Sequence, residues 1–342
     1  MVKSFASDNN SNVHDEILRK LTEANIGHYI SYGDDKYTQK AKLLFKETFG
    51  SNTEVFFVLT GTGANVCALQ AITDRYNAII CPETAHINID ECGAAEHVLG
   101  TKLLDVATSN GKLTNENIEE YLHFIADEHH VQPKIISITQ ATELGTVYTI
   151  EELKNLVNFA KKQQFKVHMD GARLCNAAVT LNCSLKELTT DIGIDVLSFG
   201  GTKNGMMIGE AVVFFYPEDI KYFPFIRKQN MQLISKMRYI AAQYIPYLSS
   251  NLWYTNAKQA NDMALYLYEK LKSTLPEILT AKPESNALFV KLPNDIAIKM
   301  QKERFFYAWD IKQNLYRFMT SYDMESADID DFVKFLIKYL RR

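Results

Sequence analysis

The sequence contains few cysteines, few prolines and no long apolar run. Its five cysteines are odd in number and form no Cys-x-x-Cys pair, so we predict neither a disulfide framework nor a zinc framework. Buried free thiols are therefore the expectation for Cys67, Cys81, Cys92, Cys175 and Cys183. Only 15 glycines and 8 prolines occur in 342 residues, of which 46% are hydrophobic, and this composition is typical of a globular chain.

Two further absences concern partners and location. The chain has 37 basic and 41 acidic residues with no basic run, which argues against a nucleic-acid partner. Its N-terminal residues lack the apolar core of a signal peptide, and no stretch approaches the length of a membrane span. We therefore expect a cytoplasmic protein with no membrane partner. The eight histidines show no spacing typical of metal ligands, so we predict no metal site.

The stretch from residue 195 to 205 places a lysine after the end of an apolar strand. The run Val196 to Phe199 predicts a short buried strand, and Gly200-Gly201 predicts a tight turn. In open parallel sheets, ligands bind outside the carboxyl ends of the strands. Lys203 is therefore either a solvated turn residue or an amine held for covalent chemistry.

A second strand pattern, Phe165 to Asp170, ends in a carboxylate. Its spacing from Lys203 allows one strand, one helix and the next strand, as in a right-handed βαβ unit. The two side chains would then project from neighbouring strand ends. This pair suits pyridoxal 5′-phosphate, because the amine can form a Schiff base and the carboxylate can keep the pyridine nitrogen protonated.

A glycine turn earlier in the chain could bind an anion. The predicted strand Val55 to Leu59 runs directly into Thr60-Gly61-Thr62-Gly63, and a predicted helix follows over Val66 to Ile72. Free amides and the positive end of the helix dipole would point at the same spot, which favours phosphate. Such a turn is more often a simple helix cap, and it matches neither a Walker loop nor a dinucleotide fingerprint.

The motifs His168-Met-Asp170-Gly-Ala-Arg173 and Thr202-Lys203 resemble the low-specificity L-threonine aldolases of the β-eliminating lyase superfamily. The resemblance covers about residues 7 to 317. It implies an α/β fold of type I among pyridoxal-phosphate enzymes, with a large domain built on a mainly parallel sheet. A smaller α+β domain would follow at the C-terminus.

The C-terminal part of the sequence predicts this second domain directly. A break between Tyr244 and Asn251, which contains a proline, suggests a division into residues 1–245 and 246–342. A long helix is predicted over Trp253 to Leu275, and an amphipathic helix over Asp328 to Arg342. Strands of a largely antiparallel sheet are predicted over residues 286–292, 306–309 and 315–319.

The resemblance also implies roles for individual residues. Those expected to bind the cofactor are Gly61, Thr62, Gly63, His86, Asp170, Thr202 and Lys203. His86 would stack on the cofactor ring, and its polar edge could pass a proton to or from the substrate hydroxyl. Those expected near the substrate carboxylate are Ser7, Arg173 and Arg317. Arg317 lies in an apolar strand, where an arginine is costly unless an anion pairs with it.

The sequence departs from the best-known members of that family at two places. Gln140 and Glu143 replace the ends of a Glu-Asn-Thr-His element, so a histidine commonly given a role at the substrate hydroxyl is absent. Glu143 is either a catalytic carboxylate base or an acceptor for a backbone amide. Residues 231–236 replace a glycine-rich loop whose arginine reaches a partner's cofactor phosphate. Lys236 is either a substitute for that arginine or an exposed helix residue.

The resemblance implies aldol cleavage of L-threonine or L-allo-threonine to glycine and an aldehyde. It also implies active sites shared across a homodimer, often within a homotetramer. One alternative is β-elimination, in which Lys203 takes the Cα proton and a β-substituent leaves. Another is a binding or regulatory protein that has kept the fold and lost turnover.

Overall fold

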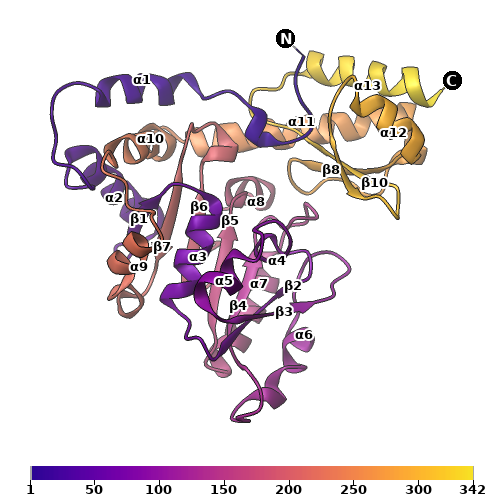
Figure 1. Ribbon diagram of the computed structural model, residues 1–342. Helices are drawn as coiled ribbons and strands as arrows, with labels where there is room; N and C mark the ends of the chain where they lie inside the picture. The colour runs from indigo at the N-terminus through magenta and orange to yellow at the C-terminus, as the bar shows by residue number, and fades with distance from the viewer. Residues whose placement is uncertain (1, 342) are drawn as a thin grey trace.

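A computed structural model describes residues 2–341, and Figure 1 shows that they form two sheets surrounded by helices. The strands of the larger sheet are β1 (Glu54–Val58), β2 (Asn77–Pro82), β3 (Lys102–Val106), β4 (Gln132–Thr139), β5 (Lys166–Gly171), β6 (Val196–Gly200) and β7 (Glu210–Phe214). Their order is β1-β7-β6-β5-β4-β2-β3. Strand β7 runs antiparallel to both of its neighbours, β1 and β6, and all other neighbouring strands are parallel. The predicted mainly parallel sheet is confirmed.

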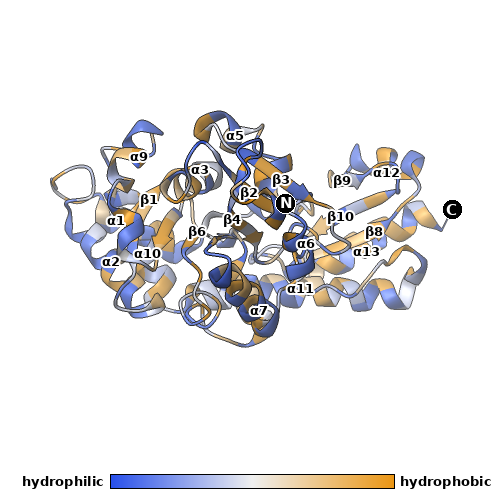
Figure 2. Cartoon of the chain, turned by 90° about the horizontal axis from the view of Figure 1, so that it is seen from below, coloured by the Kyte–Doolittle hydropathy of each residue, from blue (hydrophilic) through white to orange (hydrophobic). Residues whose placement is uncertain are grey.

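Helices pack around this sheet and bury its faces. They are α1 (Asp15–Ala24), α2 (Lys36–Phe49), α3 (Gly61–Ala71), α4 (His86–Ile89), α5 (Ala94–Leu99), α6 (Asn115–Glu119), α7 (Ile150–Lys162), α8 (Leu174–Leu181), α9 (Phe223–Gln229) and α10 (Arg238–Ser249). Strands β2 and β6 are buried along their whole length, as parallel strands covered on both faces should be. Figure 2 shows both hydrophobic and hydrophilic residues along α1 and α7, as expected for helices with one face on the core.

The core beneath α2 and α10 is rich in aromatic side chains. The Phe45 ring lies 5.8 Å from the Phe199 ring of β6 and 5.0 Å from the Tyr244 ring of α10. The Tyr244 hydroxyl donates to the Phe199 carbonyl over 3.1 Å, so the polar end of this buried ring is satisfied. These contacts fix the end of β6 from which the chain continues to Lys203.

The helical break predicted between Tyr244 and Asn251 begins later than expected. Helix α10 continues to Ser249 with Pro246 inside it, and the Ser250 amide still bonds the Pro246 carbonyl. A proline removes one helical hydrogen bond, and this proline does so only in the last turn, where few bonds follow. The chain turns instead at Asn251, whose φ of 54° is left-handed.

The C-terminal part has a sheet and a hydrophobic core of its own. Its strands are β8 (Ala287–Lys291), β9 (Tyr307–Asp310) and β10 (Leu315–Met319), and they pair antiparallel, as predicted. Their order in the sheet is β8-β10-β9. The helices are α11 (Leu252–Thr274), α12 (Asn294–Gln301) and α13 (Ser326–Leu340). Helix α11 contacts α8 and α13, and in Figure 1 it extends from above the large sheet to the small one. The division after residue 245 stays a prediction, and α10 runs across it.

Two smaller expectations have different outcomes. Three of the five thiols are buried and free, but Cys92 is exposed and Cys183 is half-buried. Cys92 differs because it lies in the short turn between α4 and α5, where its φ is 54°. Within residues 2–341, no helix combines the length and the apolar character needed to cross a membrane.

Candidate active site

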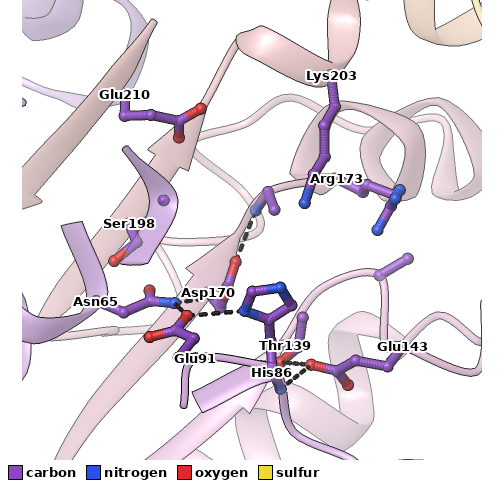
Figure 3. Close-up of a pocket in the computed structure, with 13 residues that line it drawn as sticks. Asn65, His86, Glu91, Thr139, Glu143, Asp170, Arg173, Ser198, Lys203 and Glu210 are labelled. Carbon is purple, nitrogen blue, oxygen red and sulfur yellow. Dashed lines mark hydrogen bonds and ion pairs between the residues drawn. The ribbon is translucent and has the colours of Figure 1, made fainter. Parts of the chain in front are cut away.

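The carboxyl ends of β5 and β6 bring Asp170 and Lys203 to one pocket. The two strands are parallel neighbours with Asp170 opposite Ser198, which confirms the predicted βαβ unit. The short 3₁₀ helix η3 (Thr202–Asn204) follows β6 and directs the Lys203 amine into the pocket, where Figure 3 shows it above Asp170. The covalent-chemistry interpretation of this lysine is therefore geometrically possible.

Asp170 is held as a charged carboxylate at the floor of this pocket. Its Oδ2 atom accepts a hydrogen bond from Asn65 Nδ2 at 2.9 Å, and its Oδ1 atom accepts one from the Ala172 amide at 2.9 Å. Burial acts to raise its pKa, but the positive charge of Lys203 and the Asn65 hydrogen bond lower the pKa below its ordinary value. A buried, charged carboxylate can stabilise a protonated pyridine nitrogen.

His86 is the first residue of α4 and lies beside this carboxylate. Its Nδ1 atom is 2.8 Å from Glu91 Oε1, and its backbone amide donates to Glu143 Oε1 at 2.9 Å. The hydrogen bond with Glu91 raises the pKa of the imidazole, in spite of its partial burial. The sequence predicted His86 at the site but gave no sign that carboxylates would hold both its ring and its backbone.

Glu143 uses one oxygen for structure and has the other unpaired. Oε1 accepts hydrogen bonds from the His86 amide and from Thr139 Oγ1, the latter at 2.7 Å. Among residues 2–341, no hydrogen-bond partner of the buried Oε2 atom is found. Burial raises the pKa of this carboxyl, so part of its population is protonated at a higher pH than usual.

Arg173 is already paired with a carboxylate of its own chain. Its Nε and Nη2 atoms donate to Asp8 Oδ2 and Oδ1 at 2.7 and 2.9 Å. Burial opposes ionisation of Asp8, but the guanidinium lowers its pKa. Within the described residues these bonds use two of the five N–H donors of Arg173, so the two on Nη1 and the second one on Nη2 remain for a substrate carboxylate. Ser7 and Arg173 both line a larger cavity beside the Lys203 pocket. The Ser7 hydroxyl caps the turn by accepting a hydrogen bond from the Asn9 amide.

Arg317 reaches the site from β10 of the small sheet. It lines a cavity of about 690 Å³ together with Ser7 and Arg173. Its guanidinium lies 5.3 Å from the centre of the Trp309 ring, and its buried Nε has no hydrogen-bond partner in the described part of the chain. Burial and the nearby Arg173 charge lower its pKa to about 10. The anion that this strand arginine was predicted to need stays a prediction, since its Nε atom is unpaired in the described residues.

The predicted phosphate turn forms the start of α3, five residues earlier than the helix that the sequence indicated. Gly61 lines the pocket, and the first amides of a helix have no intrahelical partner, which leaves those of Gly61 and Thr62 for a ligand. The Gly63 amide is taken by the Thr60 hydroxyl. A Cβ atom on Gly63 would lie 2.4 Å from the end of the Gln232 side chain, which would have to move to accept a larger residue here.

Two other predicted positions lie at the edge of the site. Thr202 immediately precedes the lysine, and its hydroxyl accepts the Gly209 amide at 3.0 Å. Lys236 is exposed, but it lies in the turn before α10 and not in a helix as the ordinary interpretation had it. The side chain of the 231–236 loop that reaches the α3 turn is Gln232, whose Oε1 accepts the Leu59 amide at 3.0 Å.

Several residues of the pocket were not predicted from the sequence. Asn65 ends the glycine turn, so its place in the motif could have identified it. Glu91, Thr139, Ser198 and Glu210 carry no such signal, since each lies in or near an ordinary strand or turn. Their common property, visible only in the fold, is that they line the pocket of Lys203 and Asp170.

Glu210 makes the stability of the chain depend on pH. Burial raises its pKa from the ordinary 4.5 to about 7. Between these values the folded chain binds a proton that the unfolded chain releases, so the free energy of unfolding falls as pH rises through this window. We expect Glu210→Gln to remove this loss and to gain about 2–3 kcal/mol over the unaltered chain on going from about pH 4 to about pH 8.

Urea unfolding of the cofactor-depleted protein at both pH values measures this effect. Glu269→Gln is the matched control, because Glu269 is exposed on α11. Equal pH dependence in the Glu210→Gln variant and in the unaltered chain would contradict the prediction.

The residues of the pocket fit pyridoxal 5′-phosphate. Lys203 offers an amine, Asp170 a charged and desolvated carboxylate, and the start of α3 free amides for a phosphate. Figure 3 shows the first two groups facing one space, with the His86 ring beside them. Fold and site together define a pyridoxal-phosphate-dependent enzyme of fold type I.

The chain belongs to the β-eliminating lyase family, whose family model matches residues 4–294. It is 42% identical to the low-specificity L-threonine aldolase of Pseudomonas aeruginosa, over 97% of this chain and 96% of that protein. The structure resembles a threonine aldolase from Leishmania major with a TM-score of 0.92 and 28% identity, over 98% of each chain. The resemblance predicted from the sequence motifs is confirmed.

A more distant likeness concerns the fold alone. Cystalysin from Treponema denticola, whose structure contains pyridoxal 5′-phosphate, has a TM-score of 0.75 at 11% identity. The match covers 99% of this chain and 91% of cystalysin. The predicted type I fold is therefore confirmed.

Proposed function

We propose that the protein cleaves L-threonine, L-allo-threonine and related β-hydroxy-α-amino acids to glycine and an aldehyde. One observation carries the proposal: in a chain 42% identical to a low-specificity L-threonine aldolase, Lys203, Asp170 and His86 meet in one pocket. Bound pyridoxal phosphate would supply an electron sink for the electron pair of the broken Cα–Cβ bond. Side chains of the protein would bind the cofactor, orient the substrate and transfer the proton.

The cofactor would be held from three sides. Lys203 would bind it covalently, and the charged Asp170 would keep its ring nitrogen protonated. The His86 ring would stack on it. Residues of the α3 turn, together with the one before the lysine, would surround its phosphate: Gly61, Thr62, Gly63 and Thr202.

The arginines would orient the substrate. Arg317 has a buried, unpaired Nε and lies in the wall of the larger cavity, so it is well placed to bind the substrate carboxylate. Arg173 would add the N–H groups of Nη1 and Nη2 that do not bond Asp8, and Ser7 lines the same wall. A carboxylate fixed in this way determines which Cα bond faces the electron sink.

His86 would move the proton of the substrate hydroxyl. Its ring lines both the Lys203 pocket and the larger cavity, so one edge can face the β-carbon of a bound substrate. The hydrogen bond with Glu91 raises the pKa of the ring, and imidazole is the side chain that ordinarily gains and loses a proton near neutral pH. Removing the hydroxyl proton lets the Cα–Cβ bond break and the aldehyde leave.

We infer that Glu143 positions His86 and is not the base itself. Its Oε1 atom already accepts two hydrogen bonds, one of them from the His86 amide. Glutamine can keep this acceptor while removing the carboxylate. We therefore expect Glu143→Gln to retain kcat for glycine release within about tenfold, and Glu143→Ala to lose clearly more. Steady-state kinetics decide this, and a loss of more than about a hundredfold in Glu143→Gln would make Glu143 the base.

A product assay tests the proposed function. The purified protein with added pyridoxal phosphate is incubated separately with L-threonine and with L-allo-threonine, and the products are identified. Glycine and acetaldehyde are the expected result. Ammonia and 2-oxobutyrate in their place would contradict aldol cleavage and indicate elimination.

We also propose that the protein works in the cytoplasm as a homodimer or homotetramer. Exposed apolar side chains support self-association, among them Ile30, Tyr32, Phe225 and Met231. They lie near α9 and in the segment between α1 and α2, and the Tyr32 amide bonds the Ser235 carbonyl across these two regions. A second copy would cover this apolar surface next to the α3 turn.

A further inference from the structure

A buried chain of hydrogen bonds connects His86 with Asp170. His86 Nδ1 lies 2.8 Å from Glu91 Oε1, and the same oxygen accepts from Asn65 Nδ2 at 2.7 Å. Asn65 Nδ2 also donates to Asp170 Oδ2 at 2.9 Å. Figure 3 shows these contacts as a continuous line of dashes below the Lys203 amine. The network thus joins the residue beside the substrate to the residue beneath the cofactor site.

The middle of this network is the Glu91 carboxylate, which has no ion-pair partner besides the His86 ring among residues 2–341. The Glu91 side chain is 0% exposed, and within the described residues its Oε2 atom has no hydrogen-bond partner. A buried carboxylate is costly unless it is paired or hydrogen-bonded. The Asn65 amide and the His86 ring are its close partners, and both contact its Oε1 atom.

The hydrogen-bond chemistry fixes where the imidazole carries its proton. A charged Glu91 carboxylate can only accept, and this arrangement requires Nδ1 of His86 to be the donor in the contact. In the neutral ring, Nε2 is then a bare acceptor. Figure 3 shows the Nε2 side of the ring turned away from Glu91 and toward Lys203 and Arg173. This is the side on which a substrate hydroxyl would lie.

The charged groups around His86 are few. Glu91 precedes α5, Asp170 ends β5 and Lys203 lies in η3. The hydrogen bond to Glu91 is the largest influence on the imidazole and raises its pKa, Asp170 adds to this, and Lys203 opposes it. Glu143 contacts the backbone amide of His86 and not its ring.

We propose that Glu91 is a positioning residue for the aldol cleavage. Glu91 holds the His86 ring with its proton on Nδ1, so that Nε2 can accept the proton of the substrate hydroxyl. Asn65 ties this pair to Asp170, since one amide group donates to both carboxylates. The inference rests on the proposed function for the identity of that proton. The geometry of the His86–Glu91 pair does not depend on it.

Nuclear magnetic resonance of isotope-labelled histidine in the unaltered, cofactor-saturated protein tests the geometry without any turnover. The chain has eight histidines, and a His86→Asn variant identifies the signals of His86. We expect a neutral ring protonated at Nδ1 and a pKa above the ordinary 6.5. A ring protonated at Nε2, or a pKa at or below the ordinary value, would overturn the proposal.

Variants of Glu91 test the consequence. We expect Glu91→Gln to lower the pKa of His86 by about one unit, to move the acid limb of the kcat/KM profile to lower pH, and to lower kcat at least about tenfold. Glu91→Asp restores the carboxylate and should recover part of the His86 pKa, of the position of the acid limb and of kcat. The matched control is Glu96→Gln, because Glu96 is exposed on α5 and bonds only the Leu103 amide within the described residues.

The possible outcomes separate this inference from the proposed function. An identical His86 pKa in Glu91→Gln and Glu96→Gln would show that Glu91 does not hold the ring. If the unaltered protein released no glycine, the proposed function would fail, while the resonance measurement would still decide whether Glu91 fixes the imidazole.

Discussion

Replacing Lys203 with alanine should lower glycine release from L-threonine and L-allo-threonine at least about a thousandfold, the scale on which enzymes lose activity without their covalent catalyst. The Lys203 amine is directed into the pocket above Asp170, and alanine leaves no nucleophile there. The variant should also lose the part of the cofactor's visible absorption that depends on linkage to a lysine. The product assay and an absorption spectrum measure both effects.

The matched control for this variant is Lys162→Ala, since Lys162 is an exposed lysine at the end of α7. It should keep full activity and the unaltered spectrum. Glycine release by Lys203→Ala within about tenfold of the unaltered protein would mean that another group carries the cofactor, and the assignment of this lysine would be wrong.

Replacing Asp170 with asparagine should lower kcat by about a hundredfold to a thousandfold, the cost of removing one preorganised charge from an active site. The shape of the side chain is kept, but the carboxylate that would hold the cofactor nitrogen protonated is lost. Asparagine also has only one acceptor, whereas Asp170 accepts from both Asn65 and Ala172. One of these donors would then face an amide group, which weakens the whole network.

Kinetics and a pH titration of the bound cofactor's absorption measure this second effect. Asp191→Asn is the control, because Asp191 is an exposed acid outside the pocket. A kcat within a few fold of the unaltered value, with an unchanged titration, would remove Asp170 from its proposed role. Partial retention of activity together with an altered titration would support the role of Asp170 at the electron sink, with a smaller contribution to kcat than expected.

The strand ends of the site could be predicted because they are local features. Short apolar runs followed by a carboxylate, or by two glycines and a lysine, define where β5 and β6 end. The 33-residue separation of Asp170 and Lys203 fits one helix between parallel strands, and the sheet has this arrangement. Parallel neighbours have their carboxyl ends at the same edge of the sheet. Two local sequence patterns were therefore enough to predict that both side chains lie in one pocket.

The pairs that tune these groups could not be predicted in the same way. Asp8 and Arg173 are separated by 165 positions, and Asn65 and Asp170 by 105. The sequence placed Arg173 at the substrate carboxylate, but packing of the N-terminal segment against the site also pairs its Nε and Nη2 atoms with Asp8. Glu91 is only five residues from His86, yet it follows a short helix whose turn decides which way the carboxylate points.

The sequence alone therefore determined the class of fold, the lysine and aspartate of the site, and the resemblance to threonine aldolases. All three depend on apolar periodicity and on short motifs, which are set by neighbours along the chain. The tertiary structure decided the contacts and the burial that change the pKa of each group. Glu91 contacts the His86 ring, and Asp8 pairs with Arg173. Burial raises the pKa of Glu143 and of Glu210. Hydrogen bonding and desolvation depend on atoms that lie within a few ångströms in space, and these come from segments far apart in the sequence.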